Sequence, residues 1–406
     1  MSFRSRSITI TALSAFVTIT TLSACGSSSN GNAQPKTCGT PTSGGGLLQP
    51  FTPPCTDQGS NAILVTASGE VLALGGYGFP PASADDVAFV DGWALEFSKV
   101  LVTFDHVTLS ESPDRSPGDQ SQTGALVAQA DGPWAVDLHK GGALPGKGGA
   151  GEQATPITAF TGQNKKGNAA FDPTLRYAFG FDIVAATPSA KNVNLDTSDL
   201  TDYQDMINKG YTALFVGTAT WHGGTSCTQS AAYDFTAPHF PQTVNFRFGF
   251  KSPVTNINCQ NPDNDPASPL DGEEHQRGVA LRANQTTIAQ ATFHTDHAFW
   301  ESFVHDSPAH FDQIAAQYVG SSSAPTATLE DLASVTNFAT GFTDKAGAAL
   351  PWRKCLDTFT LPNNQAQMRF DTGGISLANL RDAMTWSEST MGHLNADGLC
   401  FTNRHY

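Results

Sequence analysis

The chain has 406 residues, with 22 Lys and Arg against 37 Asp and Glu, and its formal net charge is −15. A phosphate-rich partner would be repelled by this charge, so we expect no nucleic-acid partner. Only 15% of the residues are charged, and the 38 glycines, 24 prolines and 26 phenylalanines favour a turn-rich, mainly β protein over a helical one.

The chain begins with the pattern of an export signal. Arg4 and Arg6 precede an apolar stretch, 8–22, that is too short and too rich in threonine to span a bilayer. This stretch leads into a Leu-Ser-Ala-Cys tetrapeptide that ends at Cys25 and resembles the lipobox of bacterial lipoproteins, whose cysteine is acylated and becomes the mature N-terminus. We therefore predict a signal peptide over 1–24 and lipidation of Cys25.

The lipid attachment would place the rest of the chain outside the cytoplasm. Several acyl chains hold a protein stably at a membrane, and no later stretch is long and apolar enough to cross one. Gly26 stands where an aspartate would signal retention at the inner membrane, so we expect the outer membrane, on its periplasmic or its external face. The polar run 26–46 is typical of a flexible tether, and we assign 25–60 to the lipidated cysteine and a linker.

Six further cysteines predict disulfides. Cys38, Cys55, Cys227, Cys259, Cys355 and Cys400 are an even number in a compartment that favours oxidation. Six cysteines allow 15 pairings, and proximity along the chain suggests 38–55, 227–259 and 355–400. No C-x-x-C pair is present, so neither a thioredoxin-like motif nor a cysteine zinc knuckle is predicted.

From residue 61 onward the chain predicts short strands separated by Gly, Pro, Asn and Asp. A hairpin is expected over 62–78 with its turn at Ser68-Gly69, followed by a half-buried strand over 95–109. Further strands are expected at 124–139, 175–187, 212–221, 243–251 and 278–293. Helical patterns follow at 296–318, 328–335 and 376–391. We predict one domain, 61–406, that is mainly β: an antiparallel β-sandwich with a few helices packed at one end, in the C-terminal quarter from about 296.

Histidines are concentrated at the predicted junction between the last strand and the first of these helices. A helix starting at Asp296 would place His297, Glu301 and His305 on one face, with His294 meeting them from the strand end. Imidazole and carboxylate ligands suit zinc, copper or iron, and Asp296 could accept the free ring N–H of a ligand. The alternative is that Asp296 caps the helix and the histidines only satisfy local hydrogen bonds.

Distant histidines could complete such a site. His139 shares a strand face with Asp137, whose carboxylate would accept the free ring N–H of a ligand histidine. His222 follows Trp221, and His393 lies in a Gly-His segment that runs to Cys400. Each of these histidines alone is a weak indicator of a ligand.

These motifs resemble a family of uncharacterised bacterial lipoproteins. The resemblance spans about 90–400 and rests on Asp137-Leu138-His139, on the H-x-D-H segment from His294 to His297, and on the C-terminal G-H…C motif. The resemblance implies no established activity. A fainter similarity to periplasmic copper-associated β-sandwich proteins supports metal binding by analogy only.

Three functions are compatible with these observations. The first is capture or delivery of a transition metal ion through His294, His297 and one or more of Glu301, His139, His222 and His393. The second is a surface module that binds a polymer or a protein through Trp93, Trp134, Trp221 and Trp300, which would have to be exposed. The third is a metal-dependent hydrolase with Asp296 or Glu301 as its base, which needs three ligands beside a pocket. No G-x-S-x-G, Walker or H-E-x-x-H motif is present, so a binding protein is expected rather than an enzyme.

Overall fold

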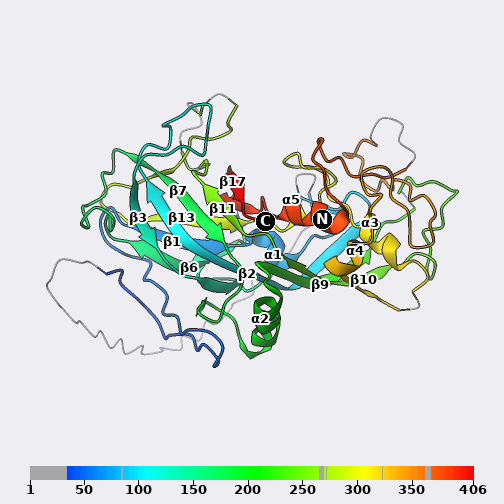
Figure 1. Ribbon diagram of the computed structural model, residues 1–406, viewed down its shortest axis with the longest axis horizontal. Coiled ribbons are helices and arrows are strands. Elements are labelled where there is room, and N and C mark those ends of the chain that lie inside the picture. The colour runs from blue at the N-terminus through cyan, green and yellow to red at the C-terminus, as the bar shows by residue number, and fades with distance from the viewer. Residues whose placement is uncertain are drawn as a thin grey trace, which may run out of the picture. The chain divides into compact units, whose positions relative to one another are not determined.

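Strands dominate the fold, with 32% of the residues in strands and 12% in helices. The computed structural model describes residues 34–83, 86–225, 227–264, 269–270, 272–321, 323–361 and 367–406. The predicted signal peptide and Cys25 lie outside the described residues. The prediction of a mainly β, sandwich-like protein is confirmed (Figure 1).

One sheet carries the strands that position the site. Within the described residues it has the order β16-β15-β13-β1-β6-β5. Its strands are β1 (Ile63–Ser68), β5 (Leu144–Pro145), β6 (Gln153–Phe160), β13 (Thr287–Phe293), β15 (Gly392–Leu394) and β16 (Gly398–Leu399). β1 and β13 are parallel and the other pairs are antiparallel. Because β1 is central, all six of its residues are buried.

The second sheet is built around the long strand β2 (Trp93–Ser110). Its main path is β14-β10-β9-β2-β7-β11-β17, and β3, β4, β8 and β12 attach beside it. The bounds are β3 (Leu126–Ala130), β4 (Trp134–Asp137), β7 (Arg176–Ile183), β8 (Lys191–Asn192), β9 (Ala213–Trp221), β10 (Thr243–Phe250), β11 (Val254–Ile257), β12 (Val279–Ala280), β14 (Thr326–Thr328) and β17 (Phe401–Arg404).

Aromatic side chains join the two sheets. Phe293 at the end of β13 packs against Phe104 of β2 and Phe181 of β7, with ring centroids 5.7 Å apart in both pairs. All three rings are buried, and they belong to one apolar core that includes residues of both sheets. Edge-on contacts between rings add to the free energy gained by removing this apolar surface from water.

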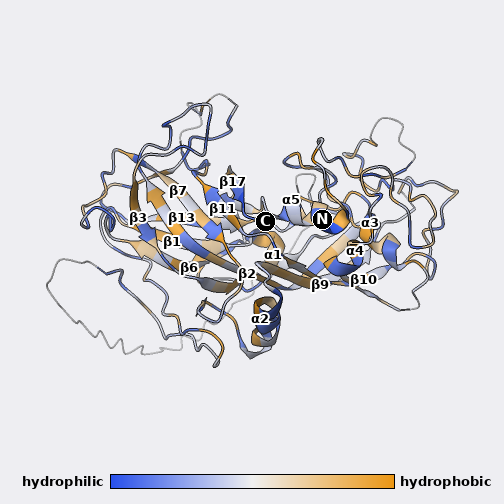
Figure 2. Cartoon of the chain, in the orientation of Figure 1, coloured by the Kyte–Doolittle hydropathy of each residue, from blue (hydrophilic) through white to orange (hydrophobic). Residues whose placement is uncertain are grey.

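The strand predicted over 95–109 is present, but both of its faces are buried along 100–105. One face packs into the aromatic core. On the other face Leu101 contacts α2 (Thr197–Lys209), whose Tyr203 and Met206 are fully buried. Asp196 and Asp199 form a capping box at the start of α2, which satisfies backbone N–H groups that would otherwise lack partners. In Figure 2 α2 is largely hydrophilic on its outside.

The remaining helices differ from the predictions. The expected hairpin over 62–78 is wrong in its second half, because α1 (Glu70–Gly75) follows β1. The expected helix over 296–318 is three short pieces, η1 (Asp296–Phe299), α3 (Asp312–Ala315) and η2 (Ala316–Tyr318). α4 (Leu329–Leu332) is capped by Thr328, where the expected segment 328–335 begins. α5 (Leu380–Glu388) is capped by Asn379 and starts later than the expected residue 376.

Three disulfides are present in the described residues. Cys38 pairs with Cys55 as predicted. The other two predicted pairs are wrong, because Cys227 bonds to Cys355 and Cys259 bonds to Cys400. The partners are separated by 128 and 141 residues, so each bond joins segments that only the tertiary fold brings together.

The segment before β1, which we assigned to a flexible linker up to residue 60, packs on the domain. Leu48 and Phe51 are buried, and the backbone of Gln49 exchanges hydrogen bonds with residues 190 and 192. The Cys38–Cys55 disulfide closes this segment. These apolar contacts place the start of the folded part earlier than the expected residue 61. Among the described residues, no helix has the length and apolar character needed to cross a bilayer.

Candidate metal centre

Two neighbouring strands bring the first two histidines together. Thr292 of β13 pairs with His393 of β15 in antiparallel register, and the next residue along, Phe293, pairs with Gly392. The backbone N–H of His294, directly after β13, donates to the carbonyl of Met391 at 2.9 Å. Strand pairing therefore places His294 beside His393, although nearly a hundred residues separate them in the chain.

The short turn after β13 adds two more histidines. His297 lies in η1 and is fully buried, and His305 follows in the loop beyond it. The ring of His393 has its centroid 4.1 Å from that of His294, 5.2 Å from that of His297 and 5.5 Å from that of His305. We call these four residues the imidazole cluster. Three of them, His294, His297 and His393, each have one ring nitrogen that could bind a metal ion, and these three nitrogens lie within 4.8 Å of one another.

The tautomer of His297 follows from its hydrogen bonds. The hydroxyl of Thr390 donates to the carbonyl of Ser387 at 2.7 Å, so its oxygen accepts the 2.8 Å hydrogen bond from Nδ1–H of His297. Nε2 must then carry the lone pair. This atom is buried and, among the described residues, has no hydrogen-bond partner. A buried imidazole nitrogen with a free lone pair and a fixed opposite side is the arrangement of a metal ligand.

The other rings repeat this arrangement. His305 has Nδ1 at 3.1 Å from the carboxylate of Asp306, while its Nε2 is buried without a partner in the described chain. His294 donates from Nε2 to the carbonyl of Ala396 at 3.2 Å, so Nδ1 is the nitrogen that would bind a metal ion after losing any proton it holds. In His393 the unpartnered buried atom is Nδ1.

Burial keeps the centre of the cluster neutral. Desolvation and the neighbouring histidines lower the pKa values of His297 and His393 well below the ordinary value for histidine. In His294 the nearby carboxylates of Glu70 and Asp296 outweigh the effect of burial and raise the pKa. Neutral imidazoles with free lone pairs are the form that coordinates a metal ion.

A cavity of about 330 Å³ opens beside the cluster. His297, His305 and His393 line it, together with Gln120, Gln260, Trp300, Phe303, Thr390, Leu399, Cys400, Phe401, Thr402 and Arg404. No carboxylate is among the described residues that line it. Three of the four rings of the cluster therefore border this cavity.

Glu301 does not join the cluster. Its Oε2 accepts a 2.6 Å hydrogen bond from Nε2 of the buried His310. The predicted face of His297, Glu301 and His305 required a continuous helix, but the backbone is extended at Trp300 and left-handed at Asp306 (φ 59°), and Pro308 follows. His305 reaches the cluster through this loop instead.

Asp296 is buried and accepts a 2.9 Å hydrogen bond from the indole of Trp300. Asp296 accepts no ring N–H of the imidazole cluster in the described chain, where the ring partners are Thr390, the Ala396 carbonyl and Asp306. Thr390 was not recognised from the sequence, because the hydroxyl of a threonine after a helix has no distinguishing pattern.

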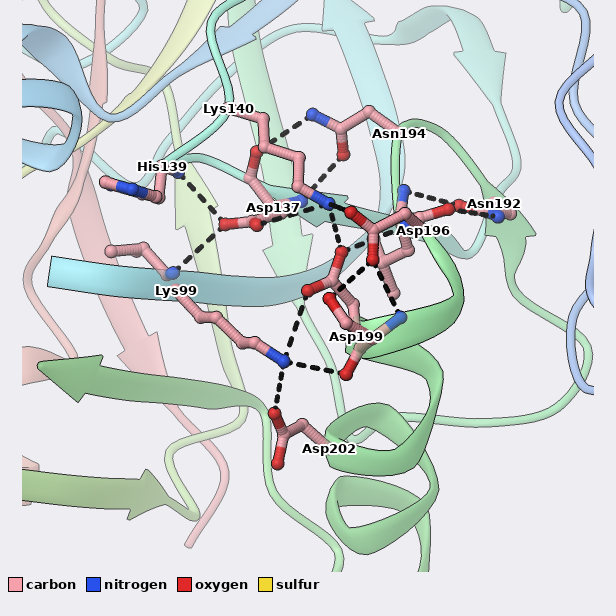
Figure 3. Close-up of polar contacts among 12 residues, drawn as sticks. Lys99, Asp137, His139, Lys140, Asn192, Asn194, Asp196, Asp199 and Asp202 are labelled. Carbon is pink, nitrogen blue, oxygen red and sulfur yellow. Dashed lines mark hydrogen bonds and ion pairs between the residues drawn. The ribbon is translucent and has the colours of Figure 1, made fainter.

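His139 and His222 lie outside every group of three metal-ligating side chains found in the described residues. Nδ1 of His139 contacts the carbonyl of Ala73 at 2.8 Å, and His222 is exposed. Asp137 accepts the backbone N–H groups of Val100 and His139 and lies near Lys140 (Figure 3). The structure therefore does not bring these three residues into the imidazole cluster: His139 contacts α1, and the backbone N–H of His222 donates to the carbonyl of Gly92.

The described residues hold two further groups of three side chains that could bind a metal ion, and one of them shares His294 with the imidazole cluster. Glu70 and Asp397 lie next to His294, and Asp105, His106 and Asp131 form the other group. Burial raises the pKa of Glu70 to about 7. Glu70 approaches Nε2 of His294 at 3.6 Å, on the side of the ring that already faces Ala396.

The tryptophans do not form an exposed platform. Trp93, Trp134 and Trp300 are buried, and Trp221 is half-buried with its indole N–H donating to the carbonyl of Asp91. The exposed arrangement that the surface-module hypothesis needs is absent for these residues.

Comparison of the chain with models of protein families, with curated proteins and with solved structures gives no significant match. The chemistry of the centre therefore follows from its own residues and their geometry.

Proposed function

We propose that this protein binds a divalent transition-metal ion through the imidazole cluster. The observation that carries the proposal is that one ring nitrogen each of His294, His297 and His393 lies within 4.8 Å of the other two, and that Nε2 of His297 and Nδ1 of His393 are buried without a hydrogen-bond partner in the described chain. Leaving a buried polar atom without a partner costs about 1–3 kcal/mol, and one bound cation would satisfy both of these nitrogens.

The donor set favours particular metals. The described cysteines are all in disulfides, and the ligands are imidazoles without a thiolate. Imidazole suits copper, zinc and iron, whereas calcium and magnesium prefer oxygen ligands. In the ordinary order of affinities for nitrogen sites, Cu²⁺ exceeds Zn²⁺ and Fe²⁺, so we expect Cu²⁺ to bind most tightly.

Capture or delivery fits the cavity better than hydrolysis. A metal-dependent hydrolase needs a general base near the ion. The two carboxylates that could serve, Asp296 and Glu301, are held by Trp300 and His310, and neither lines the cavity.

We further propose that the protein is a lipoprotein anchored to the outer membrane through Cys25. The lipobox-like sequence supports this location, and three disulfides fit an oxidising compartment. Cys25→Ser should release the protein from the membrane fraction. Retention of the variant in that fraction would contradict the anchor.

Elemental analysis tests the metal proposal. The full chain, without a histidine tag, is incubated with Cu²⁺ or Zn²⁺, desalted and measured beside His297→Ala/His393→Ala. The expected result is one ion per chain, lost in the double variant. His139→Ala/His222→Ala removes two histidines outside the cluster and should keep the ion.

Folding is monitored by circular dichroism, and His297→Gln/His393→Gln keeps side-chain volume if the alanine variant unfolds. Equal metal content in wild type and in the folded glutamine variant would overturn the proposal. So would the absence of metal from the wild type.

A further inference from the structure

We propose that the cavity beside the imidazole cluster binds a small organic carboxylate, which pairs with Arg404 and coordinates the metal ion. This inference rests on the proposed metal site. It adds a ligand class and a residue, Arg404, that the metal site alone does not involve.

Arg404 lies on a fixed strand between this cavity and a second one, which Trp386 and Tyr406 line. β17 pairs with β11 in antiparallel register, Val254 opposite Arg404 and Asn256 opposite Thr402. Along β17 the side chains of Thr402 and Arg404 are half-buried while that of Asn403 is exposed, so the first two share the inner face. The Cys259–Cys400 disulfide ties the start of β17 to the second sheet.

The guanidinium of Arg404 is held in place without being neutralised. It stacks on Trp386, 3.8 Å from the ring centroid, and its Nε donates to the hydroxyl of Ser389 at 2.8 Å. Within the described chain, no carboxylate lies within 4 Å of it, although Arg176, Arg247, Arg277, Arg353 and Arg381 each have one. The guanidinium also contacts the hydroxyl of Tyr406 but has no carboxylate partner, so it is suited to bidentate binding of a carboxylate.

The charge balance of the loaded site also calls for an anion. Neutral imidazoles leave the charge of a divalent ion uncompensated, and Arg404 adds another positive charge to the same cavity. The described residues that line the cavity include no Asp or Glu. Glu70 and Asp397 lie near His294 instead, and neither lines the cavity.

The walls define the rest of the ligand. Phe303, Leu399 and Phe401 offer apolar surface, and Arg404 is the only Lys or Arg among the described lining residues. A cavity of about 330 Å³ with apolar walls and one guanidinium suits an anion with a short apolar body better than a phosphate, which has no apolar part to pack against these walls.

The test is a titration of the Co²⁺-loaded full chain with butyrate, followed by the visible absorption of the metal. Butyramide has the same shape without the charge. We expect butyrate to change the spectrum and butyramide to leave it unchanged. Arg404→Gln should keep its Co²⁺ but raise the dissociation constant for butyrate at least 10-fold. Arg404→Lys should raise this constant by a smaller factor. Arg381→Gln, which removes an arginine paired with Asp382 outside the cavity, should behave as wild type.

Two results would overturn the inference while leaving the metal site intact. One is equal butyrate affinity in wild type and Arg404→Gln, both loaded with Co²⁺. The other is a stronger response to inorganic phosphate than to butyrate. If the wild type takes up no Co²⁺, no Cu²⁺ and no Zn²⁺, the proposed metal binding itself fails, and the inference fails with it.

Discussion

The orientation of His297 depends on one hydroxyl group. The chain of hydrogen bonds from Nδ1 of His297 to Thr390 and on to the Ser387 carbonyl fixes both the tautomer and the ring plane. Partners of this kind orient a ligand before the metal arrives, so part of the entropy cost of binding is already met during folding.

Thr390→Val keeps the shape of the side chain and removes this acceptor. We expect the dissociation constant for Cu²⁺ or Zn²⁺ to rise about 10–100-fold, the usual effect of losing an outer-shell partner. The measurement is competition with a chromogenic chelator. Thr385→Val is the matched control, because the Thr385 hydroxyl donates to the Arg381 carbonyl and touches no histidine. Equal affinity in Thr390→Val and in wild type would show that the hydroxyl does not orient the ring.

Glu388 makes stability depend on pH. It is buried at the end of α5, and desolvation raises its pKa to about 8, although a hydrogen bond from Ser252 opposes the shift. An ordinary glutamate titrates near 4.5. Between these values the folded state holds a proton that the unfolded chain has released, so stability falls as pH rises through the window.

Glu388→Gln removes this titration. In wild type the free energy of unfolding should fall by up to about 1.4 kcal/mol per pH unit between about pH 5 and pH 8 on account of this group. Urea unfolding at pH 5.5 and at pH 8 measures the change. Other groups titrate equally in both proteins, so the variant should lose less stability than wild type over this interval. The same loss in both proteins would contradict the assignment.

At the scale of elements, α2 is attached through charge as well as through packing. Asp199 is almost fully buried, closes the capping box with Asp196 and is approached by the ammonium groups of Lys99 and Lys140 (Figure 3). Tyr203 and Met206, further along the helix, fill the apolar layer against Leu101. The carboxylate of Asp199 therefore links the helix start to the second sheet.

Asp199→Ala should lower the free energy of unfolding by about 2–3 kcal/mol. Losing the hydrogen bond that Asp199 accepts from the backbone N–H of Asp196 costs about 1 kcal/mol. The remaining loss of stability arises because Lys99 and Lys140 lose a buried carboxylate partner. This loss is moderate because both ammonium groups reach solvent. Asp205→Ala, on the exposed side of α2 with Lys209 and Arg247, should cost less than about 1 kcal/mol. Chemical denaturation measures the free energy of unfolding of both variants. Equal decreases in the two variants would contradict the role assigned to Asp199.

The sequence predicted elements better where the pattern was long. The strand over 95–109 and the strand near 243–251 were recovered, because alternation over many residues is a strong signal. The helix expected over 296–318 failed because histidine spacing alone cannot show that the backbone turns at Trp300 and Pro308. α2 was missed although Asp196 and Asp199 have the spacing of a capping box, because few apolar residues mark its buried face.

At the scale of the whole molecule, the site depends on contacts between distant segments. His294 and His297 were recognised as neighbours from the sequence, and His393 was one of several candidates. Only the pairing of β13 with β15 distinguishes it from His139 and His222. The disulfides show the same dependence on distant contacts. The local pair Cys38–Cys55 was predicted from the sequence, whereas the pairs 227–355 and 259–400 follow from the arrangement of the sheets.

Anomalous X-ray diffraction from crystals of the metal-loaded protein, at the Cu or Zn absorption edge, tests the central claim most directly. We predict a single strong peak in the imidazole cluster, about 2.0–2.1 Å from Nε2 of His297 and from Nδ1 of His393. A peak at Asp105, His106 and Asp131 instead, or no peak in crystals grown with excess metal, would contradict the claim.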